Sequence, residues 1–354
     1  MNRSLSKLLK GAVAAAACAG LALPGAQAAE KKDFKIAWSI YVGWMPWGYA
    51  ADTGIVKKWA DKYGITIEVK QFNDYVESIN QYTAGAFDGV TLTNMDALSI
   101  PSAGGVDTTA VIVGDYSNGN DAIILKGKDK LEDIKGQTVN LVEFSVSHYL
   151  LARALESIGL AEKDVKVVNT SDADMASAYT TPDVTAVVTW KPIVSTILDS
   201  PDAKLVYDSS KTPGEIIDMM VFNTEVLKDN PKLGKALAGI WYDTIKALET
   251  DAAAKEAMAK ASGTDVAGFD GMLTTTKMFW TPKDAVAFVT SAEVKTTSEK
   301  VSTFLFEKAL LGKDAKSPGA IGIEFPDKSV FGEKGNVKLR FDATYMQEAA
   351  DGKL

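Results

Sequence analysis

The chain has 354 residues, of which 38 are basic and 46 acidic, and its formal net charge is −8. A negative balance of this kind disfavours nucleic acid and anionic membranes as partners. A single cysteine, Cys18, and a single histidine, His148, exclude a disulfide framework and a site rich in His or Cys, so we expect no metal and no cofactor.

Residues 1–28 have the pattern of a secretory signal, with three basic residues, a short apolar stretch and the sequence Ala-Gln-Ala at 26–28. The apolar stretch is too short for a permanent membrane span, although an N-terminal anchor is the alternative interpretation. Without the signal, 35 basic and 46 acidic residues remain, which is a net charge of −11. We therefore expect an exported, periplasmic protein.

Strands alternate with helices in the first part of the chain. The expected elements are a strand at 34–40, a helix at about 47–63, a strand at 65–69, a helix from Asn73 or Asp74 to about 84, and strands at 87–93 and 109–113. This alternation predicts an α/β domain with a mainly parallel sheet.

A second α/β unit follows, and the chain then returns to the first. The expected elements are strands at 122–125, 138–142, 165–168, 184–189 and 216–222, and helices at 145–159, 172–180, 232–248, 252–261, 265–273 and 282–311. The tail after Ser317 is rich in Gly and Pro and is not assigned. We expect one lobe from 29–118 with 220–354 and a second from 119–219, connected near 117–122 and 219–223.

Aromatic and acidic residues stand at the carboxyl ends of these strands, where open α/β sheets bind their ligands. The candidates for ligand binding are Trp44, Trp47, Asp74, Asn94, Asp96, Asp115, Glu143, Ser145, Trp190 and Asp218, with Tyr41, Asn73 and Tyr116 behind them. Carboxylates accept the N–H groups of a planar cation, and indole faces stabilise its charge. Arginine, the usual partner of bidentate anions, is scarce, since only Arg153 and Arg340 follow the signal. The pattern predicts a small planar cation as the ligand.

Several candidates have a structural alternative. Trp47 is equally suited to the core face of the following helix, and Asp74 and Asp96 are suited to helix N-caps. Asp115 and Asp218 stand near the expected crossings, where a hydrogen bond that stabilises a hinge is the alternative. For Trp44 and Trp190 the alternative is packing, in the case of Trp190 between the two domains.

Glu143 stands just before Ser145, the expected N-cap of the helix at 146–159. Helix N-termini attract anions, so a carboxylate already placed there would repel an anionic ligand. The alternative is that Glu143 only complements the helix dipole. Within this helix, His148 is expected to be a core histidine with a hydrogen bond, and Arg153 to pair with Glu156 or a nearby acid.

Five segments, in order, resemble the exported solute-binding proteins of the nitrate/sulfonate/taurine class of ATP-driven importers. They are 85–89 (GAFDG), 126–139 (KGKDKLEDIKGQTV), 147–155 (SHYLLARAL), 159–165 (GLAEKDV) and 188–192 (VTWKP). The resemblance implies a periplasmic-binding-protein fold of type II, with two lobes and a cleft between them. It also implies a monomer that binds a small molecule and delivers it to the membrane subunits of an ABC importer.

Other segments resemble one branch of that class, whose members are encoded beside urea carboxylase, an enzyme set associated with guanidine breakdown. They are 93–98 (TNMDAL), 114–121 (GDYSNGND), 141–149 (LVEFSVSHY), 169–174 (NTSDAD) and 213–216 (PGEI). The likeness implies guanidine or urea as cargo. Lys191 departs from the branch, which has Asn before the proline.

The competing interpretation is an enzyme. Thiamin-pyrimidine synthases of the same superfamily need several histidines and a Cys-rich iron site, which one His and one Cys exclude. The sequence has no G-x-S-x-G elbow for a serine hydrolase, whereas a pair of carboxylates as in glycosidases stays open. We expect a binding protein without catalytic residues. The alternatives are a binder of urea or another amide, a binder of a sulfonate- or nitrate-type anion, and an exported hydrolase.

Overall fold

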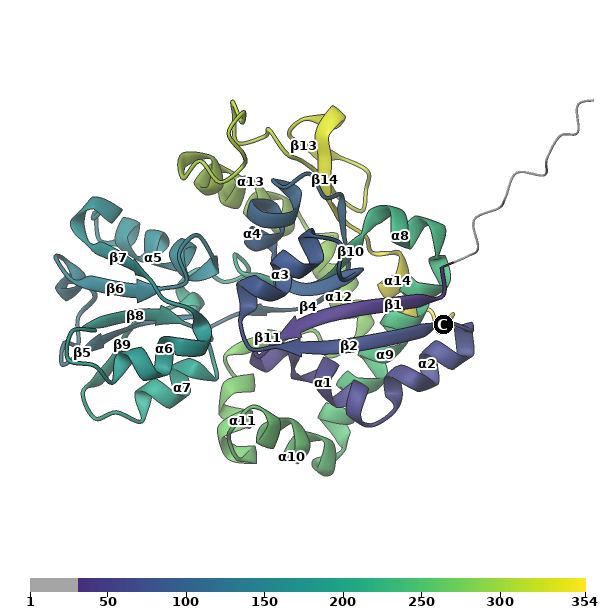
Figure 1. The fold of residues 1–354 in the computed structure, drawn as a ribbon, viewed down its shortest axis with the longest axis horizontal. Coiled ribbons are helices and arrows are strands. Elements are labelled where there is room, and N and C mark those ends of the chain that lie inside the picture. Colours follow the sequence, from purple (N-terminus) through teal and green to yellow (C-terminus); the bar gives the residue numbers. More distant parts are fainter. Residues whose placement is uncertain (1–30) are drawn as a thin grey trace, which may run out of the picture. The chain divides into compact units, whose positions relative to one another are not determined.

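The computed structural model describes residues 31–354, and the predicted signal at 1–28 lies outside the described residues. Two β-sheets with helices around them organise this part of the chain (Figure 1). Among residues 31–354, no helix combines the length and the apolar composition that a membrane span requires.

Within the described residues the larger sheet has nine strands, in the order β13-β12-β14-β4-β10-β3-β1-β2, with β11 paired to β4. They are β1 (Asp33–Ser39), β2 (Thr66–Phe72), β3 (Gly89–Thr93), β4 (Thr108–Ser117), β10 (Ile217–Asn223), β11 (Thr276–Met278), β12 (Gly322–Glu324), β13 (Val330–Phe331) and β14 (Val337–Phe341). Only β10, β11 and β13 run antiparallel to their described neighbours.

The smaller sheet has the order β7-β6-β8-β5-β9. Its strands are β5 (Ala122–Lys126), β6 (Thr138–Leu141), β7 (Lys166–Asn169), β8 (Ala186–Thr189) and β9 (Ala203–Asp208). β5 is antiparallel to both of its neighbours, and the other pairs are parallel. Both sheets are therefore mainly parallel, as the strand–helix alternation predicts.

Helices cover both sheets (Figure 1). They are α1 (Met45–Asp52), α2 (Ile55–Tyr63), α3 (Tyr75–Thr83), α4 (Asn94–Ala97), α5 (Val146–Ser157), α6 (Asp172–Tyr179), α7 (Ile193–Leu198), α8 (Thr224–Asp229), α9 (Pro231–Thr250), α10 (Ala252–Ala261), α11 (Val266–Leu273), α12 (Pro282–Val289), α13 (Ala292–Glu307) and α14 (Thr344–Ala350).

The smaller sheet is apolar on both faces because alternate residues of a strand point to opposite sides. In β5, Ile123 and Leu125 belong to the main hydrophobic core together with the buried residues of α5. Ala122 and Ile124 pack in a second core with the buried residues of α6 and α7. A strand that is buried on both faces has a continuous apolar sequence, as residues 122–125 of β5 do.

The larger differences between the sequence-based expectations and the structure concern two helices, the return crossing and the tail. The helix expected at 47–63 is two helices, α1 and α2, separated at Gly54, whose φ of 80° only glycine adopts readily. The helix expected at 282–311 is likewise two, α12 and α13. The return crossing lies between the end of β9 at Asp208 and the start of β10 at Ile217, and not at 219–223, so the expected lobe boundary at 219 falls inside β10. The unassigned tail contributes β14 beside β4.

Candidate functional site

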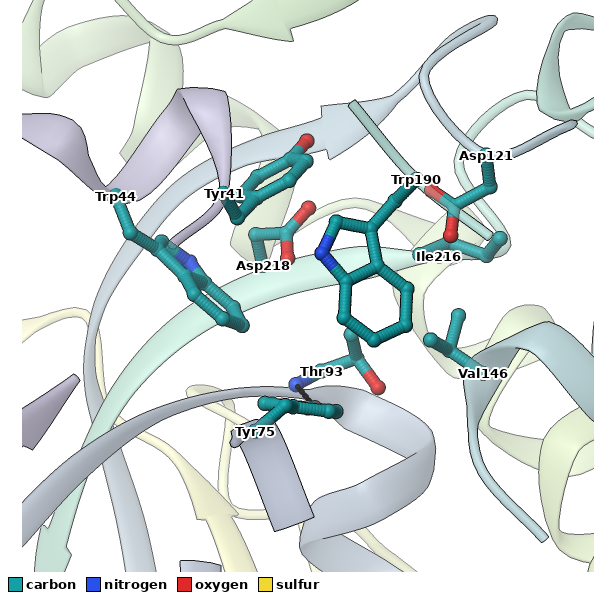
Figure 2. Close-up of a pocket in the computed structure, with 9 residues that line it drawn as sticks. All are labelled: Tyr41, Trp44, Tyr75, Thr93, Asp121, Val146, Trp190, Ile216 and Asp218. Atoms are coloured by element: carbon teal, nitrogen blue, oxygen red, sulfur yellow. Dashed lines mark hydrogen bonds between the residues drawn. The ribbon is translucent and has the colours of Figure 1, made fainter. Parts of the chain in front are cut away.

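Nine residues enclose a small cavity of about 10 Å³ (Figure 2). They are Tyr41, Trp44, Tyr75, Thr93, Asp121, Val146, Trp190, Ile216 and Asp218. A cavity of this size is close to the smallest that holds one water molecule. Its residues stand at strand ends, helix starts and the two crossings, which is where α/β sheets bind ligands. We infer that this cavity is the candidate ligand site.

Four aromatic rings form a continuous wall of the cavity. Tyr41 packs edge-on against Trp44 with ring centroids 5.1 Å apart, and Trp44 lies 5.6 Å from Tyr75. Tyr75 in turn meets Trp190 edge-on at 5.5 Å. Trp190 also donates a hydrogen bond from Nε1 to the Ile40 carbonyl over 3.3 Å, which links the end of β8 to the end of β1. Electron-rich ring faces of this kind stabilise a cation.

Three buried acids, Asp115, Asp121 and Asp218, form what we call the acidic cluster. Asp218 of β10 stands opposite Asp115 of β4 and, on its other side, opposite Thr93 of β3. Tyr41 Oη donates to Asp115 Oδ1 over 2.9 Å. Asp121 and Asp218 line the cavity, whereas Asp115 lies behind it.

The acidic cluster lacks a compensating charge. Among the described residues, no Lys, Arg or His forms an ion pair with any of its three carboxyl groups. Burial raises the pKa of Asp115 to about 7 and that of Asp121 to about 7. Burial together with the charges of Asp115 and Asp121 raises the pKa of Asp218 well above its ordinary value. Such a cluster is stabilised either by protons or by a bound cation.

Asp96 occupies a separate buried position below the aromatic wall. Its Oδ2 accepts hydrogen bonds from Tyr75 Oη at 2.7 Å and from Thr93 Oγ1 at 2.8 Å. Burial raises the pKa of Asp96 to about 6, against the opposing effect of hydrogen bonds from Tyr75, Thr93 and the backbone N–H of Val146 at the start of α5. Asp96 therefore places a carboxyl group near the N-terminus of α5, where we expected Glu143 to act.

Three of the ten predicted site residues line the cavity: Trp44, Trp190 and Asp218. Asp115 and Asp96 contact lining residues through the hydrogen bonds above. Whether any of these five contacts a ligand stays a prediction.

The other five predicted residues have structural roles outside the lining. Trp47 is buried against Trp241, with ring centroids 5.5 Å apart. Asp74 caps α3 by accepting from the Glu77 N–H. Ser145 caps α5 by accepting from the Ser147 N–H. The Asn94 amide bridges Glu215 O and Ile217 N. Glu143 is half-buried, and its backbone N–H donates to Asn169.

Two further expectations for α5 are confirmed. His148 is buried, and its Nδ1 accepts a hydrogen bond from the Phe144 N–H over 3.1 Å. Arg153 pairs with Glu156, and in addition with Glu215 over 2.9 Å.

Sequence reasoning missed five lining residues: Tyr75, Thr93, Asp121, Val146 and Ile216. Tyr75 directly follows Asp74, and its position close to the end of a strand is the sequence feature that could have identified it as a site residue. Asp121 directly precedes β5, and no strand end or helix start marks it in the sequence. In the described chain no group of three or more His, Cys, Asp or Glu residues has the arrangement to hold a metal ion.

A profile of the NMT1-like family matches residues 28–262, about two thirds of the chain. The chain belongs to the NMT1-like family. The taurine-binding periplasmic protein of Escherichia coli (strain K12) is 22% identical over 185 residues, which is 51% of this chain and 56% of that protein. The chain thus spans just over half the length of the curated relatives it matches.

Solved structures show the same fold. The alkanesulfonate-binding protein SsuA from Xanthomonas axonopodis pv. citri, bound to MOPS, has a TM-score of 0.66 at 18% identity, over 81% of this chain and 96% of that chain. The periplasmic nitrate-binding protein NrtA from Synechocystis PCC 6803 has a TM-score of 0.58 at 12% identity, over 92% and 99%. The expected α/β periplasmic-binding-protein fold is therefore confirmed.

Proposed function

We propose that this chain is the periplasmic solute-binding component of an ABC importer, a binding protein and not an enzyme. Its fold and family are those of proteins named for binding taurine, alkanesulfonate and nitrate. The protein would act as a monomer, capture a small solute and deliver it to the importer's membrane subunits. The lobes would be 29–118 with the chain after the return crossing, and 119 to that crossing, with the cavity in the cleft between them.

The proposed solute is guanidinium, or a closely similar planar cation. The observation that carries this choice is a cavity lined by Asp121, Asp218 and four aromatic rings, with no basic residue in the lining. Guanidinium offers N–H donors around its edge and a flat charged face. Carboxylates accept hydrogen bonds from these N–H groups, and indole or phenol rings stack on the flat face.

An anionic solute fits this cavity poorly, although the relatives named above bind anions. A sulfonate or nitrate would lie among three buried acids without a basic partner, so its desolvation would be uncompensated. Asp96 adds a fourth buried carboxyl group near the start of α5. The anion alternative would therefore require a different arrangement of this cavity.

Urea is the second candidate, and one observation favours it. Trp44 Nε1 is a buried donor without a hydrogen-bond acceptor among the described residues, and the carbonyl of urea could accept from it. Two other donors, next to the lining residues Thr93 and Trp190, are engaged elsewhere: the Asn94 amide bridges two backbone groups, and Lys191 Nζ donates to Thr275 Oγ1 over 2.9 Å. We rank guanidinium above urea because its positive charge would compensate the buried acids, whereas urea is neutral.

A thermal-shift panel combined with analysis of the recovered solute tests this function. We expect the unfolding temperature to rise with guanidinium concentration, as for a ligand that binds only the folded state. The panel contains guanidinium chloride, urea, taurine and nitrate, with sodium chloride at matched ionic strength as the control. Recovery of a chemically altered solute would contradict the binding-protein proposal, and stabilisation by taurine or nitrate alone would contradict the cation.

A further inference from the structure

The four acids around the cavity are buried, and none of them forms an ion pair with a residue in the described part of the chain. Asp96 and Asp115 are fully buried, and Asp121 and Asp218 are each 3% exposed. An ionised carboxylate in such a place costs several kcal/mol unless it is paired. The four carboxyl groups therefore need either protons or a bound cation to neutralise them.

The β4–β10 register forces two of these carboxyl groups together. Directly opposed residues on neighbouring strands have side chains on the same face, within reach of each other. Asp115 and Asp218 are such a pair. The Oδ2 atom of each is buried and has no hydrogen-bond partner among the described residues. Two opposed carboxylates that are buried without a counter-ion cannot both stay ionised, so one of them holds a proton.

The groups that face the Asp115–Asp218 pair are acidic or neutral. Tyr41 Oη, from the loop after β1, donates to Asp115, and Asn120 Nδ2 donates to Tyr41 Oη over 3.1 Å. Asp121 contributes a further negative charge from the first crossing. From β11 the residue opposite Asp115 is Met278. The neighbouring η1 turn (Val42–Trp44) presents Gly43, where a Cβ atom would lie 2.4 Å from Asp115 Oδ2.

We propose, building on the cationic ligand of the proposed function, that the cation binds in exchange for the proton shared by Asp115 and Asp218. In the ligand-free protein the proton neutralises the pair. When the cation enters the cavity beside Asp218 and Asp121, it supplies the positive charge, and the proton passes to solvent buffer. One cation enters and one proton leaves, so the charge of the site is conserved. Asp115 does not line the cavity, and it acts as a positioning residue that keeps the proton on Asp218.

Titration calorimetry of the full chain with guanidinium chloride, in phosphate and in Tris at pH 7, measures the exchange. Because the two buffers differ in their enthalpy of protonation, released protons make the observed enthalpy depend on the buffer. We expect a release approaching one proton per cation. We also expect an affinity that increases with pH between about 6 and 8, by up to about tenfold per pH unit. An enthalpy that is independent of buffer, with a flat pH profile, would overturn the proposal.

The variant Asp115→Asn removes the proton-sharing partner and keeps both lining acids. We expect it to release fewer protons per cation and to have a shallower pH profile, since only Asp121 still titrates near pH 7 beside the cation, whereas a merely structural role would weaken binding and leave the proton count unchanged. Asp183→Asn makes the same change of charge at an exposed residue and serves as the matched control, with wild-type proton release. If Asp115→Asn does not fold, the two-buffer measurement on the unmodified protein still decides the question.

The two proposals fail in different ways. Guanidinium binding without proton release would overturn the exchange and leave the proposed function standing. Absence of guanidinium binding in either buffer would overturn the proposed ligand, and the exchange with it.

Discussion

At the scale of single residues, Asp218 and Trp44 are the side chains on which cation binding should depend most. Asp218→Asn removes a buried carboxylate beside the ligand, and we expect a loss on the order of 2–5 kcal/mol in guanidinium affinity. Trp44→Ala removes a ring face, and we expect a smaller loss of about 1–2 kcal/mol. Titration calorimetry gives both values.

Glu143→Gln is the control for this pair of variants. The sequence points to Glu143 as the acid that pairs with the cation, but the structure places Glu143 outside the cavity lining. Its replacement should therefore leave guanidinium affinity within about 0.5 kcal/mol of the wild type, as expected for a surface substitution. A loss at Glu143 as large as that at Asp218 would mean that the ligand binds elsewhere.

The buried acids also predict how stability depends on pH. Asp115 and Asp121 have a pKa of about 7 in the folded protein against 3.8 for an ordinary aspartate. Between these values the folded state binds more protons than the unfolded state, so the free energy of unfolding falls as pH rises through this window. Without ligand we expect the unfolding temperature to fall from about pH 5 to pH 8. Asp115→Asn should show a shallower slope, and a rise over this range would contradict the assignment.

At the scale of elements, the β1–α1 connection brings the backbone close to the acidic cluster. A Cβ atom at Gly43 would lie 2.4 Å from Asp115 Oδ2 and 2.6 Å from Tyr41 Cε1. Gly43→Ala should therefore displace the Tyr41–Asp115 hydrogen bond and lower stability by about 1–3 kcal/mol, as overpacking does. Denaturant unfolding measures the change. Gly271→Ala, where a Cβ atom meets no neighbour within 4 Å, is the control.

The elements that sequence patterns predict well are those with strong periodicity or clear caps. The strands of both sheets up to β8 follow from apolar runs, and the start of α5 follows from Ser145. β14 was not predicted, because a short strand between Gly- and Pro-rich segments gains its stability from pairing with β4, far away in the sequence. The break between α1 and α2 falls at Thr53 and Gly54, and a single glycine within a helical pattern marks such a break only weakly.

The candidate site was predictable only in part, because some of its residues are brought together by strand pairing between segments that are far apart in the sequence. Strand ends identified Trp44, Asp218 and Trp190, since the carboxyl ends of parallel strands meet at one edge. The pairing of Asp115 with Asp218 depends on the β4–β10 register, which one sequence does not define. Asp121 lies in a crossing, and its position follows from the packing of two sheets and not from any local pattern.

At the scale of the whole molecule, contacts outside the cavity connect the group around the smaller sheet to that around the larger sheet. Lys191 Nζ donates to Thr275 Oγ1, and the Tyr75 N–H, at the start of α3, donates to Asp172 Oδ1 over 3.2 Å. Two crossings and contacts of this kind suit a protein that closes on its ligand by hinge bending.

Small-angle scattering tests this closure. We expect the radius of gyration to decrease when guanidinium saturates the protein, because the solute favours the closed arrangement. Sodium chloride at the same ionic strength should cause no decrease, and Asp218→Asn should need a higher guanidinium concentration. A radius of gyration unchanged at saturation would argue against two moving lobes.

The central claim is that this member of the NMT1-like family binds a small planar cation. Titration calorimetry of the wild-type protein with guanidinium, urea, taurine and nitrate, at one pH and one ionic strength, tests it most directly. The buried acids and the aromatic wall predict that guanidinium binds more tightly than urea, and that taurine and nitrate do not compete with it. Tighter binding of urea, taurine or nitrate than of guanidinium would contradict the claim.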